Sequence, residues 1–265
     1  MPTFRSITIG QYIPGESLLH RLDPRTKILV TCFLVVGLFF IDSFLGYGLA
    51  ALYIGLAVLR SGIPPRYLFR GLRPVIAIIL LTFLLNCFMT EGEILWQWGF
   101  LTLTREGLSR GGMLAIRLIL LIVGTSILTL TTSPIALTDG LEILLRPGKR
   151  LGIPAHELAM MMTIALRFIP TLLEETEKIM KAQMARGADF ESGNLLQRAK
   201  SLLPLLVPLF VSAFRRADEL AVAMEARCYR GGEGRTKLNQ LAFRWADYLA
   251  IGGSGLFIMW LAWAM

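Results

Sequence analysis

Long segments without any charged residue are the feature that most constrains this sequence. Segments 74–90, 118–138 and 248–265 contain no charge, and segment 28–59 contains a single one, Asp42. A helix of about 17–25 apolar residues crosses the hydrocarbon core of a bilayer. Hydrophobic residues make up 54% of the chain, which exceeds the share usual in soluble domains. The sequence therefore predicts an all-α, multi-pass membrane protein embedded in a lipid bilayer.

About five membrane-spanning helices are predicted from these segments. We expect four of them at about 26–40, 44–59, 72–90 and 112–131, and the last one at 244–265. Asp42 and Ser43 form a polar break between the first two helices. A single long helix over residues 28–59 is the alternative, because each of the two separate helices is short for a bilayer.

The distribution of basic residues predicts how these helices are oriented. The N-terminal arm (1–27) and the connection at 60–73 are basic, whereas the connection before the fourth helix carries acidic residues as well. Cytoplasmic loops of membrane proteins carry an excess of Lys and Arg. We therefore expect a cell-membrane protein with a cytoplasmic arm, four spans within 28–132, a cytoplasmic region at 133–243, and a final span whose C-terminus lies outside.

The region 133–243 holds most of the charged residues of the chain and two helical patterns. Apolar side chains recur at helical spacing from Leu158 to Met184, and Gly187 is placed to end that helix. A second apolar stripe runs from Ala213 to Cys228. The patterns predict long amphipathic cytoplasmic helices rather than further membrane spans.

Both amphipathic helices are expected to end in the same way. One ends in Ala185-Arg186-Gly187 and the other in Ala226-Arg227-Cys228, so that each presents an arginine between an alanine and a small residue. Arginine carries five donors in a rigid fork that can bind carbonyl and carboxylate groups in a groove. The repetition indicates a device that engages two related partners. The alternative is that each arginine only complements the negative end of its own helix.

Enzyme and nucleic-acid classes find little support in the sequence. The chain has no GxxxxGK[ST] phosphate loop, no GxSxG elbow and no HExxH motif, and its three Cys and two His are scattered. No basic run is interleaved with aromatic residues as nucleic-acid binding requires. We expect a non-enzymatic subunit without a cofactor, driven by energy from elsewhere. A gradient-driven secondary transporter and an intramembrane hydrolase or transferase are the rivals.

One charged residue falls within the predicted fourth span. Arg117 lies near the start of that segment, so we expect its side chain to extend toward the membrane surface. A residue on a transport path is the alternative, because charge inside a membrane is often functional.

Several short motifs, in this order, resemble the transmembrane components of energy-coupling factor (ECF) transporters. They are GQYIPGES at 10–17, HRLDPRTK at 20–27, LRFIP at 166–170, RRADELA at 215–221 and the two Ala-Arg helix ends. The resemblance covers essentially the whole chain. Its second helix end carries Cys228 where Gly or Ser is expected.

The resemblance implies a scaffold that joins two ATP-binding-cassette (ABC-type) ATPases, EcfA and EcfA′, to a separate substrate-binding membrane subunit, the S component. The helices of 133–243 would then be coupling helices, with Ala185, Arg186, Gly187, Ala226, Arg227 and Cys228 as the ATPase-coupling motifs. Closure of the ATPases would move these helices, topple the S component and release its vitamin inward. Specificity for the vitamin would reside in the S component.

Overall fold

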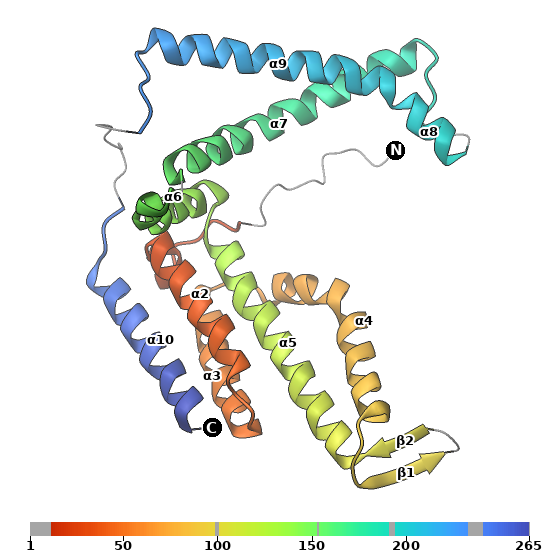
Figure 1. The fold of residues 1–265 in the computed structure, drawn as a ribbon, viewed down its shortest axis with the longest axis vertical. Coiled ribbons are helices and arrows are strands. Elements are labelled where there is room, and N and C mark those ends of the chain that lie inside the picture. Colours follow the sequence, from red (N-terminus) through yellow and green to blue (C-terminus); the bar gives the residue numbers. More distant parts are fainter. Residues whose placement is uncertain (1–11, 99–100, 153, 191–193, 233–240, 265) are drawn as a thin grey trace. The chain divides into compact units, whose positions relative to one another are not determined.

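The computed structural model describes residues 12–98, 101–152, 154–190, 194–232 and 241–264. These residues are mostly helical, which confirms the all-α class (Figure 1). They form two compact units. The bundle unit contains residues 10–144 and 240–265, and the second unit, the arm unit, contains residues 145–239.

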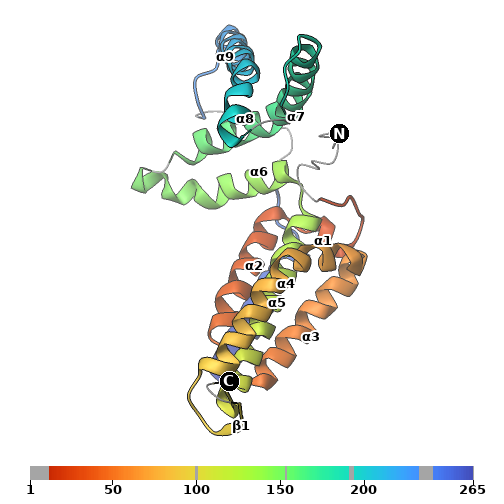
Figure 2. The same cartoon turned by 90° about the vertical axis from the view of Figure 1, so that its right-hand side faces the viewer.

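The bundle unit is built around one long central helix, α5. Its helices are α1 (Leu18–Arg21), α2 (Pro24–Phe39), α3 (Phe44–Ser61), α4 (Pro65–Met89), α5 (Arg105–Thr131), most of α6 (Pro134–Leu145), and α10 (Trp245–Ala264). The central α5 packs against α2, α3 and α4 (Figure 2), and α10 packs against α2 (Figure 1). The helices of the bundle therefore come from both ends of the sequence.

The polar break near Asp42 separates two helices, as predicted, and the single-helix alternative is wrong. Helix α2 ends with Phe40 as its C-cap, and α3 begins with Ser43 as its N-cap. The Ser43 side chain accepts a hydrogen bond from the backbone N–H of Gly46 at 3.1 Å. Serine is a strong N-cap because it satisfies an N–H that the helix leaves without a partner.

Two helices begin earlier than the apolar segments predicted. Helix α4 begins at Pro65 rather than near residue 72, and α5 begins at Arg105 rather than near residue 112. Proline favours the first position of a helix, and Thr104 caps α5 by accepting a hydrogen bond from Gly107 N–H at 3.1 Å. Both start signals lie in polar segments, so hydropathy alone misses the first turns.

A β-hairpin between α4 and α5 was not predicted. Strands β1 (Ile94–Trp98) and β2 (Leu101–Thr104) pair in antiparallel fashion. The Thr104 hydroxyl donates a hydrogen bond to the carbonyl of Thr90 at 2.7 Å, and the Glu106 carboxylate accepts one from Glu93 N–H at 2.7 Å. These bonds tie the hairpin to the ends of both helices.

Four of the described helices are long and apolar enough to cross a membrane: α3, α4, α5 and α7 (Ala155–Ala185). The first three match predicted spans. Helix α2 has only 16 residues, and neither it nor α10 is among the four. Length and composition alone select this set. The span assignments of α2 and α10, the cytoplasmic assignment of α7 and the predicted domain boundaries therefore stay predictions.

The core of the bundle unit joins α2, α3, α5 and α10. Its fully buried side chains include Leu38, Ile41, Tyr47, Ile54 and Leu261. Helices α2 and α10 lie close together at Gly37, where an added Cβ would collide with the side chain of Ile258. A larger residue at position 37 would push the two helices apart.

The arm unit consists of helices that pack lightly on each other. A 3₁₀ helix (Arg146–Leu151) leads into α7, and α8 (Leu195–Ser201) leads into α9 (Leu203–Ala226). Helices α7 and α9 pack together, yet many of their apolar side chains remain exposed, among them Met161, Val207, Phe210 and Phe214. Exposed apolar surface of this extent marks an interaction face.

Candidate coupling site

The first predicted helix end, Ala185-Arg186-Gly187, forms a Schellman cap. Arg186 is the C-cap of α7, and Gly187 follows with a φ of 88°, in the left-handed region. Gly187 N–H donates to the carbonyl of Met184 at 2.9 Å, and Ala188 N–H donates to that of Gln183 at 3.0 Å. These two bonds define the motif. The prediction that Gly187 ends this helix is confirmed.

The second helix end, Ala226-Arg227-Cys228, forms the same cap. Cys228 N–H donates to the carbonyl of Glu225 at 2.8 Å, and Tyr229 N–H donates to that of Met224 at 3.0 Å. Cys228 has a φ of 56° and is the one non-glycine residue with a positive φ among the described residues. Non-glycine residues avoid this conformation. The cap geometry is therefore kept even where the residue is unfavourable.

The two arginines leave their helices with nearly the same backbone geometry. Arg186 has φ and ψ of −89° and 6°, and Arg227 has −92° and 13°. All six residues of the two caps are exposed. The side chains of both arginines lack a hydrogen-bond or ion-pair partner within the described ranges. We call these two exposed caps the arginine tips.

The arginine tips lie at opposite ends of an antiparallel helix pair. The Gln183 side chain donates to the carbonyl of Pro204 at 3.3 Å, which places the first tip beside the start of α9. The Tyr229 hydroxyl lies 3.5 Å from His156 Nε2, which places the second tip beside the start of α7. Because α9 has 24 residues, a rise of 1.5 Å per residue separates the tips by roughly 36 Å.

A purely local role explains these arginines poorly. Backbone N–H groups already bind the carbonyls of Gln183 and Met184 in the first tip, and those of Met224 and Glu225 in the second. The guanidinium groups are therefore not needed to satisfy the last helical turn. Exposed forks without local partners remain available to another molecule.

Comparison with known proteins identifies the family. Residues 15–238 match the family model described as "cobalt transport protein". A transmembrane protein of the energy-coupling factor transporter, EcfT, from Thermosediminibacter oceani is 65% identical over 252 residues, which cover 95% of each chain. The EcfT of Bacillus subtilis is 55% identical over 244 residues, or 91% of this chain and 92% of the relative. This chain belongs to the EcfT family.

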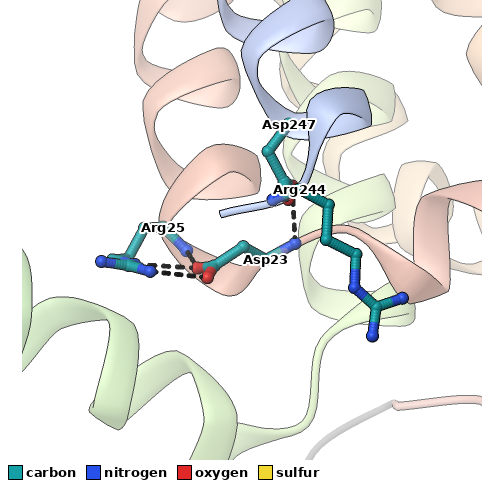
Figure 3. A network of polar contacts seen from close by, with 4 residues as sticks. All are labelled: Asp23, Arg25, Arg244 and Asp247. Atoms are coloured by element: carbon teal, nitrogen blue, oxygen red, sulfur yellow. Dashed lines mark hydrogen bonds and ion pairs between the residues drawn. The ribbon is translucent and has the colours of Figure 1, made fainter. Parts of the chain in front are cut away.

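A second polar cluster of this EcfT-family chain joins its first and last long helices (Figure 3). The Asp247 carboxylate is buried, and its two oxygens accept the backbone N–H groups of Asp23 and Arg244, both at 2.8 Å. Asp23 in turn caps α2 by accepting Arg25 N–H at 2.9 Å. One carboxylate thus serves the N-terminal ends of both α2 and α10. We call this arrangement the carboxylate clasp.

Asp23 is itself held by Arg25. The Arg25 guanidinium donates two hydrogen bonds to the Asp23 carboxylate, at 2.8 and 3.0 Å. Burial raises the pKa of Asp23. The side-chain and backbone hydrogen bonds from Arg25, together with the positive charges nearby, lower the pKa by more than burial raises it. The net pKa of Asp23 lies below its ordinary value, so the residue is a stable anion near neutral pH.

Arg117 reaches the turn between α2 and α3, which lies at one end of the bundle. Its Nε donates to the Tyr47 hydroxyl at 2.7 Å. Its Nη2 donates to the carbonyl of Ile41 at 3.0 Å and lies 3.4 Å from the carboxylate of Asp42. Because α5 begins at Arg105, Arg117 lies well inside the helix. Its guanidinium therefore fastens the turn between α2 and α3 to α5. Tyr47 gave no polar signal in the sequence.

The remaining sequence expectations are only partly covered. The motif at 10–17 lies partly outside the described residues, whereas the other motifs fall within them. Within the described ranges, no group of three or more His, Cys, Asp or Glu residues could hold a metal ion.

Proposed function

We propose that this EcfT-family component couples two ABC-type ATPases to a separate substrate-binding membrane subunit and has no catalytic role of its own. The observation that supports this proposal is the pair of arginine tips. They share one cap geometry, they are exposed, and they lie at opposite ends of one helix pair. Two equivalent anchors separated in this way suit two related partners, one at each tip.

In this proposal, contacts between α7 and α9 transmit movement from both tips. Arg216 on α9 lies 3.1 Å from Glu175 on α7, and both side chains are half-buried. The bond from Gln183 to the carbonyl of Pro204 adds a second connection. In this proposal, closure of the ATPases on ATP binding moves both tips, and the helix pair moves with them.

The exposed apolar faces of the helix pair would receive the substrate-binding subunit. Leu203, Val207, Phe210 and Phe214 recur at helical spacing on α9, and all four are exposed. In this proposal their movement reorients the subunit, which releases its vitamin or other micronutrient to the cytoplasm. Specificity for the cargo belongs to that subunit.

The proposed orientation puts the arm unit and the N-terminal arm in the cytoplasm. A small buried cluster contains Ile63, Leu68 and Leu130. The first two belong to the basic connection at 60–73, so this connection lies at the end of the bundle where α5 ends. The opposite ends carry Asp42, Glu93 and Glu106. Basic residues at one end of a bundle favour a cytoplasmic location for that end.

A pull-down in detergent tests the coupling role. Tagged protein is purified from native membranes as the wild type and as the Arg186→Glu plus Arg227→Glu variant. A buried arginine anchor contributes about 2 kcal/mol, roughly 30-fold in affinity, so we expect two ATPases with the wild type and neither with the variant. The matched control is Lys181→Glu plus Arg230→Glu, which makes the same charge change near the tips and leaves the caps intact.

The outcomes separate the proposal from its rivals. Loss of the ATPases in both variants would show a general electrostatic effect rather than anchoring by the tips. A well-folded wild type that carries no ATPase would refute coupling and favour a gradient-driven secondary transporter.

A further inference from the structure

The start of α10 forms an open hollow on the surface of the bundle unit. Phe243, Arg244, Trp245 and Tyr248 line a space of about 590 Å³, and its lining is almost entirely apolar. Trp245 is 86% exposed and Tyr248 is 60% exposed. Exposed apolar surface of this kind marks a site of contact with a membrane, a ligand or another protein.

Arg244 supplies a free positive charge at this hollow. Its backbone N–H belongs to the carboxylate clasp, but its side chain points away from Asp23 and Asp247 in Figure 3. The guanidinium has no hydrogen-bond or ion-pair partner in the part of the chain that the structure describes. It therefore can bind an anion.

Arg25, another cation of this cluster, is paired with a carboxylate. Its guanidinium pairs with Asp23 at 2.8 Å and lies 3.9 Å from the centre of the Phe243 ring. The Phe243 ring in turn lies 5.5 Å from that of Tyr248. These contacts fix one wall of the hollow and leave the Arg244 guanidinium without an ion-pair partner among the described residues.

The hollow continues into an apolar face along the whole of α10. Exposed side chains recur at helical spacing, namely Trp245, Tyr248, Leu249, Leu256, Met259, Trp260 and Trp263. The opposite face packs on α2 through Ile258 and Leu261. From residue 245 to 263 the helix rises about 27 Å, close to the ~30 Å thickness of the hydrocarbon core of a bilayer.

Aromatic residues mark both ends of this face. Trp245 and Tyr248 lie at its start, and Trp260 and Trp263 lie at its end. Trp and Tyr concentrate at the two interfaces between membrane and water. With α10 as the predicted last span, the hollow lies at the depth of the lipid headgroups and the rest of the face lies beside the acyl chains.

We propose that this hollow binds one anionic phospholipid. The Arg244 fork holds the phosphate through paired hydrogen bonds, the rings of Trp245 and Tyr248 cover the glycerol region, and an acyl chain lies along the exposed face of α10. A zwitterionic lipid brings its own cation to the phosphate, so the unpaired guanidinium of Arg244 favours an anionic headgroup. This proposal does not depend on the proposed coupling function.

Native mass spectrometry of the intact transporter tests the proposal. The complex is equilibrated in mixed micelles with equal amounts of phosphatidylglycerol and phosphatidylcholine, and the retained lipids are counted. The wild type is expected to retain one phosphatidylglycerol in preference to phosphatidylcholine. Arg244→Gln is expected to reduce that preference roughly tenfold, since hydrogen bonds to charged groups contribute about 1.5–3 kcal/mol.

Two further variants separate charge from shape. Trp245→Ala keeps the charge but removes a wall, so the retention of both lipids is expected to fall. Arg60→Gln is the matched control, because Arg60 is an exposed arginine at the end of α3 and lines no such hollow. It is expected to retain phosphatidylglycerol as the wild type does.

Three results would overturn the proposal. The first is equal retention of phosphatidylglycerol by Arg244→Gln and the wild type. The second is displacement of the lipid by inorganic phosphate alone, which would make the occupant a free anion. The third is a photo-crosslinker at position 248 that captures a polypeptide instead of a lipid. Each result leaves the capture of ATPases by the arginine tips unaffected, so failure here is distinct from failure of the coupling function.

Discussion

Substitutions at the residue that follows each capping arginine are expected to change the two tips in opposite directions. Gly187 and Cys228 both occupy the left-handed region, with φ of 88° and 56°. Gly187→Ala is expected to destabilise its tip, whereas Cys228→Gly is expected to stabilise the other. The comparison tests whether both tips are the same cap.

The magnitudes follow from the backbone. An added Cβ at Gly187 meets no atom within 4 Å, so only the backbone conformation opposes a substitution there. The left-handed conformation costs a non-glycine residue about 1–2 kcal/mol. Glycine loses about 0.5–1 kcal/mol more conformational freedom than alanine on folding. Gly187→Ala is therefore expected to cost about 1 kcal/mol locally, and Cys228→Gly to gain about 0.5–1 kcal/mol.

Amide hydrogen exchange at the tips measures these changes. The reporting amides are those of Ala188 and Tyr229, whose N–H groups close the two caps. Protection of Ala188 is expected to fall roughly fivefold in Gly187→Ala, and protection of Tyr229 to rise about two- to fivefold in Cys228→Gly. Cys228→Ser is the control, because it removes the thiol and keeps the same backbone strain.

The opposite signs make the reasoning easy to refute. A Cys228→Gly variant with reduced protection at Tyr229 would mean that the cysteine side chain, and not the cap, holds this tip. An equal rise in Cys228→Ser and Cys228→Gly would mean that removal of the thiol matters and strain does not.

Three further predictions concern the bundle unit, each measured by reversible unfolding in mixed micelles. Asp247→Ala is expected to lower the free energy of unfolding by about 2–4 kcal/mol, because one buried and one partly buried N–H group lose their acceptor, and Asp247→Asn is expected to cost less, because it keeps one acceptor oxygen. Tyr47→Phe is expected to cost about 1–3 kcal/mol, since Arg117 Nε loses its acceptor, and an unchanged unfolding midpoint would show that this bond is dispensable. Acid is expected to weaken the unit: the pKa of Asp23 is lower in the folded chain than its ordinary 3.8, so its contribution is present above that value and is lost as the pH falls through the folded pKa, a loss that Asp23→Asn abolishes.

Helices and helix ends of this chain were predictable where the signal is local. The break at Ser43 is a local N-cap, and the end of α7 at Gly187 is a local C-cap. Both were found because a few neighbouring residues determine them. The pairing of the two arginine tips was found for the same reason.

Contacts between distant segments were not predictable. The carboxylate clasp joins Asp23 to Asp247 across 224 positions, and no sequence periodicity connects the two. The bond of Arg117 to Tyr47 joins α5 to α3, and a tyrosine inside an apolar run gives no sign of a polar partner. The β-hairpin was missed because its two strands have only five and four residues. The left-handed backbone at Cys228 runs against the conformational preference of a non-glycine residue. The hydrogen bonds of the cap hold it there.

The carboxylate clasp has a consequence for how the protein is made. A chain that enters the membrane from its N-terminus exposes α2 long before α10 exists. Until residue 247 arrives, the N–H of Asp23 lacks its carboxylate partner and the surface at Gly37 lacks Ile258. Helix α2 therefore stays incompletely packed while the 224 positions between Asp23 and Asp247 are synthesised. Closure of the bundle by α10 must follow the synthesis of every segment between these two residues.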